Sequence, residues 1–209
     1  MLSPMQRDVL TEMVNVYVGQ AASFLSEMVN QKVLLSVPEV ELINVGEVEN
    51  PEYSLPAFPL AGHIISSSMR FGHDFKGKAF LVFPAEEAKL LVNACTGEDN
   101  NPEQNQTFTD FLDTDFDVLK EISNVILNAI VGEFGNFLDT KLEYSLPDIE
   151  LLFVSAPEQK SILEKDIYIL LLHTTFLLAE TKIKGVIMIA LSMNSVSWLI
   201  SKIDELLED

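Results

Sequence analysis

The chain has 209 residues, of which 32 are acidic and 13 basic, so its formal net charge at neutral pH is −19. Hydrophobic residues make up 48% of the chain, which is enough for a buried core and argues against intrinsic disorder. The acidic balance disfavours nucleic acid, because phosphate contacts need clusters of Lys and Arg. It also opposes docking on an anionic membrane. We therefore expect a folded protein with no nucleic-acid partner and no membrane insertion, whose partners present positive groups.

Three sequence features predict a cytoplasmic location. The single cysteine, Cys95, excludes an intramolecular disulfide and fits a reducing compartment. Residues 1–8 lack a basic stretch followed by an apolar one, so no secretory signal is predicted. The most apolar stretch, residues 167–179, is too short to cross a bilayer. Because Cys95 ends an apolar helix-like segment, we expect its thiol in the core rather than as a nucleophile.

The first half opens with a helical pattern from about Ser3 to Asn30. At about 100° per residue, one broad arc of this helix is apolar and comprises Val9, Leu10, Met13, Val14, Val16, Tyr17, Phe24, Leu25 and Met28. Glu12 and Asn15 lie within about 40° of Asp8 on the opposite side. Because an apolar arc must face a core, we expect the stripe formed by Asp8, Glu12 and Asn15 at the surface.

The remaining segments repeat one order of elements. The first half continues with strand-like segments at 39–48, 58–71 and 77–84 and a short helix at 85–95. A polar linker covers residues 96–112. The second half has a helix at 113–140, strand-like segments at 148–154, 167–179 and 182–192, and a helix at 194–207. We therefore predict one domain, residues 1–209, made of two repeats (1–95 and 113–209).

The spacing Asp-x3-Glu-x2-Asn-x22-Pro occurs in both halves, 109 residues apart. Its two copies are Asp8, Glu12, Asn15 and Pro38, and Asp117, Glu121, Asn124 and Pro147. A repeat at fixed spacing indicates duplication. We therefore expect an α+β fold of two α-β-β-β-α halves with pseudo-two-fold symmetry, in which two long helices pack on an antiparallel sheet. Both prolines follow a long helix and are expected to end a helix or begin an edge strand.

The second long helix carries its own polar stripe, formed by Asp117, Glu121, Asn124 and Asn128. A Glu and an Asn three positions apart on one helix face can reach the same point on a docked partner. The carboxylate can pair with a cation, and the carboxamide can hold a water molecule in a fixed orientation. A solvated helix face is the alternative for a single stripe, but duplication at fixed spacing favours a functional site.

The sequence gives little support to other kinds of catalysis. Neither stripe contains Ser, Cys or His in a triad-like arrangement, which disfavours a self-contained hydrolase. The three histidines, His63, His73 and His173, lack the spacing of metal ligands. We therefore expect no metal and no cofactor of the protein's own.

The repeated motif resembles the pattern of the CheC/CheX/FliY family of bacterial chemotaxis phosphatases. Flanking segments are similar as well, namely Gly19-Gln20-Ala21-Ala22, Ser36-Val37-Pro38 and Ser145-Leu146-Pro147. The resemblance covers essentially the whole chain, and two complete motifs make it specific. Val14 and Ser123 stand where family members often have Gly before the motif Asn, and both suit a helix.

Within this family the chain is most like CheC. CheX resembles one such unit that dimerises, whereas this chain has two sites in about 200 residues. FliY-type proteins carry additional flagellar-switch sequence, and we expect none here because both repeats together use the whole chain. The resemblance also implies a monomer, since a duplicated chain can form within itself the contacts that a single unit forms by dimerising.

The resemblance implies hydrolase activity on the aspartyl phosphate of a CheY-like response regulator. The receiver domain of that partner carries its own Mg²⁺ and a Lys beside the phosphate. By resemblance, Asn15 and Asn124 enter the receiver's pocket and orient water in line with phosphorus. Glu12 and Glu121 pair with the receiver's Lys.

Asp8 and Asp117 belong to the pattern, and we expect them to support the helix start or partner docking. An alternative function is a weakly active adaptor, which acts mainly through a CheD-like deamidase or sequesters the phosphorylated regulator. A flagellar-switch scaffold is a third possibility.

Overall fold

The computed structural model describes residues 2–44, 62–97, 111–154, 167–178 and 181–208. Its elements, in chain order, are α1 (Pro4–Val29), β1 (Val33–Asn44), β2 (Gly62–Gly72), β3 (Gly77–Pro84), α2 (Ala85–Thr96), α3 (Asp113–Phe137), β4 (Glu143–Tyr144), β5 (Asp148–Val154), β6 (Ile167–Leu178), β7 (Thr181–Ser192) and α4 (Met193–Glu208). The predicted α+β class and the repeated order of elements are confirmed, with β5 at the predicted bounds and the two-residue β4 as an additional strand.

The strands form one antiparallel sheet to which both halves contribute. Its order is β1-β6-β7-β3-β2, and β4 and β5 both pair with the outer edge of β2. At the centre, β3 of the first half pairs with β7 of the second. At the two ends, β1 pairs with β6, and β5 pairs with β2. Each half thus contributes its first strand to the other half, so the two repeats share one sheet.

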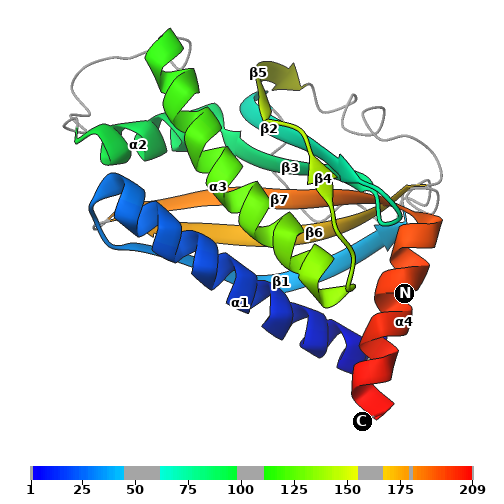
Figure 1. The fold of residues 1–209 in the computed structure, drawn as a ribbon. Helices are drawn as coiled ribbons and strands as arrows, with labels where there is room; N and C mark the ends of the chain where they lie inside the picture. The colour runs from blue at the N-terminus through cyan, green and yellow to red at the C-terminus, as the bar shows by residue number, and fades with distance from the viewer. Residues whose placement is uncertain (1, 45–61, 98–110, 155–166, 179–180, 209) are drawn as a thin grey trace.

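The long helices α1 and α3 run in opposite directions across the same face of this sheet (Figure 1). The main core lies between these helices and the sheet. Tyr17 of α1 meets Phe134 of α3 edge to face, with ring centroids 5.8 Å apart. Phe134 also stacks on Phe75, next to β3, at 6.3 Å. Smaller apolar clusters occupy the other sheet face, around Ile64 and Ile169.

The buried face of α1 is narrower than the apolar arc that helical phase predicts. Seven residues are buried, namely Leu10, Val14, Tyr17, Val18, Ala21, Ala22 and Leu25. Val16, Phe24 and Met28, which were expected in the core, have 56%, 57% and 39% of their surface exposed. The reason is geometric, because a helix that lies on a sheet buries only the side chains at spacings of three and four on one side.

The two long helices begin with equivalent contacts to the short helices. Gln6 on α1 donates a hydrogen bond from its amide Nε2 to Asp204 Oδ1 of α4 at 2.6 Å. The residue 109 positions later, Asp115 on α3, pairs with Lys89 Nζ of α2 at 2.7 Å. Each long helix is therefore held by the short helix of the opposite half, as pseudo-two-fold symmetry requires.

Both motif prolines interrupt an edge strand. Pro38 lies within β1, where the register shifts between Ser36 and Glu39. Pro147 separates β4 from β5. The expected helix-ending role is wrong, because α1 and α3 end at Val29 and Phe137. The predicted edge position is correct, and its cause is that proline cannot donate to a ladder and is tolerated at edges and bulges.

Several predicted boundaries also shift. Strand β1 starts at Val33 rather than at 39, because residues 33–36 already pair with β6. The outer parts of the first two predicted strands, 45–48 and 58–61, lie outside the described residues, as does most of the predicted linker.

Cys95 is half-buried on α2 and packs against the main core, as expected. Burial raises the pKa of its thiol to about 11. Because the thiolate is the reactive form, this thiol is poorly suited to nucleophilic attack near neutral pH. In the part of the chain that the structure describes, we find no helix that is both long and apolar enough to cross a membrane.

Two glycines offer a matched test of core packing. A methyl group at Gly185 in β7 would lie 2.4 Å from Cε1 of the buried Phe83 ring, whereas one at Gly132 in α3 meets nothing within 4 Å. We expect Gly185→Ala to lower the free energy of unfolding by about 1–3 kcal/mol through overpacking. Gly132→Ala should raise it by about 0.5–1 kcal/mol through helix propensity. Urea unfolding followed by circular dichroism measures both, and an unchanged midpoint for Gly185→Ala would contradict the packing described here.

Candidate functional site

The first stripe lies on a well-capped helix. Ser3 Oγ accepts from the backbone N–H of Gln6, whose side chain accepts from Ser3 N, and Pro4 occupies the first helical position. Asn30 ends the helix in the left-handed conformation, with φ 51°. These caps satisfy helix-end groups. They set the helix phase in which Asp8, Glu12 and Asn15 are all exposed.

Asn15 is held at both ends of its carboxamide. Its Oδ1 accepts a hydrogen bond from the backbone N–H of Val37 in β1, at 3.1 Å. Its Nδ2 donates to the carbonyl of Thr11 at 3.0 Å. About three turns further along α1, Ser26 Oγ accepts from the N–H of Val33 at 2.9 Å. Two polar side chains of α1 therefore bind backbone amides of the edge strand β1.

The second stripe has the same helical positions but different contacts. Asp117 and Glu121 are exposed on α3, while Asn124 is half-buried. Oδ1 of Asn124 accepts a hydrogen bond from Nδ2 of Asn128, at 2.8 Å. Leu146, which corresponds to Val37, has 74% of its surface exposed. The carboxamide oxygen is thus bound in both copies, by a backbone donor in one and by a side-chain donor in the other.

The two glutamates are available to a partner. Neither Glu12 nor Glu121 forms a hydrogen bond or an ion pair through its side chain with any residue in the described ranges, and both are exposed. A carboxylate without a local cation keeps its full attraction for a cation on another molecule. The same holds for Asp8 and Asp117, which precede the glutamates by one turn.

The residue before each motif Asn faces the core. Val14 has no exposed surface, and Ser123 is 3% exposed. The hydroxyl of Ser123 donates to the carbonyl of Leu119 at 2.6 Å, which satisfies it within the helix. Both departures from the family pattern therefore fit the helix, as predicted.

The two stripes form separate sites. Tyr17 and Phe134 mark where the antiparallel helices meet. Asn15 lies two residues before Tyr17, and Asn124 lies ten residues before Phe134. At 1.5 Å per residue this places the two asparagines roughly 18 Å apart along the helix axes. A single small pocket on a partner molecule therefore cannot take both asparagines at once.

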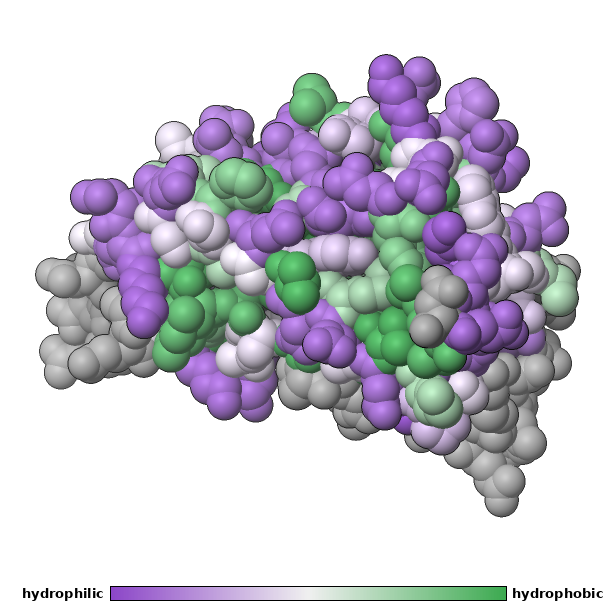
Figure 2. Space-filling view, turned by 60° about the horizontal axis from the view of Figure 1, so that its bottom comes forward, coloured by the Kyte–Doolittle hydropathy of each residue, from purple (hydrophilic) through white to green (hydrophobic). Residues whose placement is uncertain are grey.

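The surroundings of the first stripe include exposed apolar side chains. Met5 and Val16, with 61% and 56% of their surface exposed, flank Glu12 on α1. From this side the surface is a mixture of hydrophilic side chains and separate hydrophobic patches (Figure 2). The corresponding positions of α3 hold Thr114, which is exposed but polar, and the half-buried Val125. At these two positions the first stripe is therefore the more apolar at the surface.

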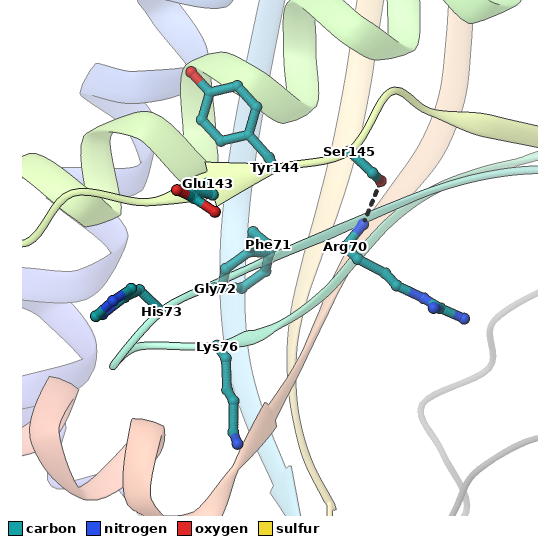
Figure 3. A pocket seen from close by; sticks show the side chains of 8 residues that line it. All are labelled: Arg70, Phe71, Gly72, His73, Lys76, Glu143, Tyr144 and Ser145. Carbon is teal, nitrogen blue, oxygen red and sulfur yellow. Dashed lines mark hydrogen bonds between the residues drawn. The ribbon is translucent and has the colours of Figure 1, made fainter.

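A hollow of about 500 Å³ lies elsewhere, at the turn between β2 and β3 and beside β4. Three of its lining residues, Arg70, His73 and Lys76, are basic, but their side chains point in different directions (Figure 3). Glu143 opposes their charge, and His73 is paired with Asp74 at 3.2 Å. The residues that line the hollow include none of the motif, so it is not part of either site.

In the described ranges, no group of three or more His, Cys, Asp or Glu side chains lies close enough to bind one metal ion. The histidines have other neighbours. The ring of His63, for example, lies 5.0 Å from that of Phe153.

Sequence comparison matches residues 5–42 to the family model described as the CheC-like family. This stretch contains the whole first motif. The flagellar motor switch phosphatase FliY of Bacillus subtilis is 24% identical over 154 residues, which are 74% of this chain and 38% of FliY. The CheY-P phosphatase CheC of the same organism is 22% identical over 159 residues, which are 76% of this chain and 72% of CheC. This chain therefore spans about two fifths of the length of FliY.

Structural comparison gives the same fold. FliY of Thermotoga maritima has a TM-score of 0.70 at 15% identity, covering 98% of both chains. The middle domain of FliM from H. pylori has a TM-score of 0.65 at 12% identity, covering 96% of this chain and 99% of that domain.

These likenesses do not favour CheC over FliY, so the narrower prediction of a CheC-type member is not supported beyond the family. The duplicated motif, the match of its first copy to the CheC-like family and the similarity to FliY and CheC along three quarters of the chain agree with one another. The chain is therefore similar to the CheC/CheX/FliY family, with its first motif inside the stretch that matches the CheC-like family model.

Proposed function

We propose that this protein hydrolyses the aspartyl phosphate of a CheY-like receiver domain and that it uses two sites, Glu12 with Asn15 and Glu121 with Asn124. The observation that carries the proposal is the duplicated presentation of an unpaired, exposed glutamate one turn before an asparagine. Both pairs lie on helices packed on a common sheet, so each pair is held in position before a partner arrives.

The chemistry divides between the two proteins. The receiver contributes the phosphoryl group, its Mg²⁺ and its Lys. This chain contributes a carboxylate for that Lys and a carboxamide that holds the attacking water. The water oxygen forms a bond to phosphorus while the bond from phosphorus to the aspartyl oxygen breaks. Inorganic phosphate and a free aspartate carboxylate result, and the protein supplies position rather than acid or base strength.

Removing both carboxamides tests the catalytic role. With Asn15→Ala and Asn124→Ala together, a phosphorylated receiver should decay at its intrinsic rate, because no side chain is left to orient water. Each single variant should keep part of the acceleration. The measurement is the loss of radiolabelled phosphate from the receiver over time. Asn136→Ala, at an exposed asparagine of α3, is the matched control and should behave as the wild type. Full acceleration by the double variant would refute the mechanism.

Neutralising both glutamates tests partner recognition. Glu12→Gln together with Glu121→Gln should raise KM for the phosphorylated receiver by about tenfold or more, because a hydrogen bond to a charged group contributes about 1.5–3 kcal/mol. The effect of added salt on KM should also become smaller. Glu27→Gln, at an exposed position of α1, changes net charge without touching either site and should leave KM unchanged. An unaltered KM for the double variant would remove the proposed pairing with Lys.

A binding protein without strong catalysis is the second candidate, and the shared fold with the FliM middle domain favours it. A fold common to a motor-switch protein and to phosphatases does not by itself establish activity. In this case the protein would sequester the phosphorylated regulator, or would act through a CheD-like deamidase.

Stoichiometry separates the two candidates. If the protein is a catalyst, one part in about a hundred should still accelerate the decay of the entire receiver pool, because each site turns over. The measurement is the decay rate as the protein is diluted against a constant amount of receiver. An effect that disappears below equimolar protein would identify a binder.

A further inference from the structure

The two motif asparagines have their carboxamide oxygens bound by different donors. In the first copy the donor is the backbone N–H of Val37, 3.1 Å from Oδ1 of Asn15. In the second copy it is Nδ2 of Asn128, 2.8 Å from Oδ1 of Asn124. The two arrangements place a donor on the same atom of the same motif residue.

Sequence and structure together show that each copy has one of these donors and lacks the other. Counting 109 residues forward, Gly19 of α1 corresponds to Asn128 of α3, and glycine has no side chain to donate. The space beside Gly19 is open, with nothing within 4 Å of an added Cβ. Counting back, Val37 corresponds to Leu146, which is largely exposed where the chain passes from β4 to β5. The side chain of Asn128 therefore stands in for a backbone contact that the second half lacks.

The side chain of Asn128 has a feature that helix packing does not explain. Its Oδ1 is buried and has no hydrogen-bond partner among the described residues. A buried amide oxygen without a hydrogen bond lowers the stability of the fold. Its presence in a native structure therefore needs an explanation, such as a functional role. An apolar residue at this half-buried position would avoid that cost. The other end of the same amide makes the contact with Asn124.

Orientation matters because a carboxamide has two chemically opposite ends. A half-turn about its last bond exchanges a donor for an acceptor. A hydrogen bond to the oxygen selects one of these two states and directs the NH₂ end away from the bond. A residue that positions water must present one defined end to it.

We propose that Asn128 is a positioning residue of the second site, where its amide holds Oδ1 of Asn124 and turns the Nδ2 end of Asn124 toward the bound receiver. This inference rests on the proposed function. Asn128 itself does not touch the phosphoryl group. It binds Oδ1 of Asn124 as the backbone N–H of Val37 in β1 binds Oδ1 of Asn15.

The test uses Asn15→Ala as the parent, so that only the second site contributes. In this parent, Asn128→Ala removes the donor. Asn128→Asp keeps the shape but can only accept, so it should attract the Nδ2 end of Asn124 and reverse the carboxamide. Both substitutions should lower kcat for receiver dephosphorylation by about ten- to a hundredfold, with KM changed less than twofold for Asn128→Ala because Glu121 is untouched. Asn136→Ala in the same parent is the control and should have no effect.

Two further measurements separate positioning from a structural role. Asn128→Ala should not lower the melting temperature, because it also removes the unsatisfied oxygen. The effects of Asn124→Ala and Asn128→Ala should be non-additive, so that the double variant is no slower than Asn124→Ala alone. An active parent whose kcat is unaffected by both substitutions at Asn128 would overturn this inference and leave the proposed function standing. A parent that leaves the receiver at its intrinsic decay rate would overturn the proposed function of this site, and the inference with it.

Discussion

The burial of α1 and α3 against one face of one shared sheet is the constraint on which the other features depend. Because each half contributes its first strand to the other, the sheet is continuous from β1 to β5, and both long helices pack on it. A helix in this position has only one side left for solvent. Glu12, Asn15, Glu121 and Asn124 occupy that side in both repeats, so the fold presents two similar surfaces for a partner.

The edge strands connect this architecture to the motif. In the first repeat, the 22-residue interval from Asn15 to Val37 is the path from the exposed side of α1 into β1, and the hydrogen bond between them closes that path. The proline that follows interrupts the strand at its register shift. The motif asparagine thus has a structural contact as well as its proposed catalytic one. A substitution there can change the edge of the sheet, which is why a two-site comparison is more informative than a single variant.

The two sites have diverged within a common frame. The first has exposed Met5 and Val16 beside it and a backbone donor for its asparagine. The second has the polar Thr114 in place of Met5 and a side-chain donor, Asn128. Differences of this kind leave the fold unchanged but alter the side chains that a partner would contact. The relatives that the chain resembles include FliY, named a flagellar motor switch phosphatase, and CheC, named a CheY-P phosphatase.

The sequence by itself determined the class of fold, the order of elements, the duplicated motif and the exposure of its acidic residues on two helices, because helical phase and a fixed repeat are local properties that can be counted. Only the tertiary structure decided that β1 pairs with β6, that the prolines interrupt edge strands, and that Val16 is exposed. It alone showed the donors to Asn15 and Asn124. The strand pairing joins segments more than a hundred residues apart, and the donor to Asn15 is a backbone group, so neither leaves a periodic signal in the chain. Asn124 and Asn128 lie on one predicted stripe, but only the structure shows which of their atoms meet.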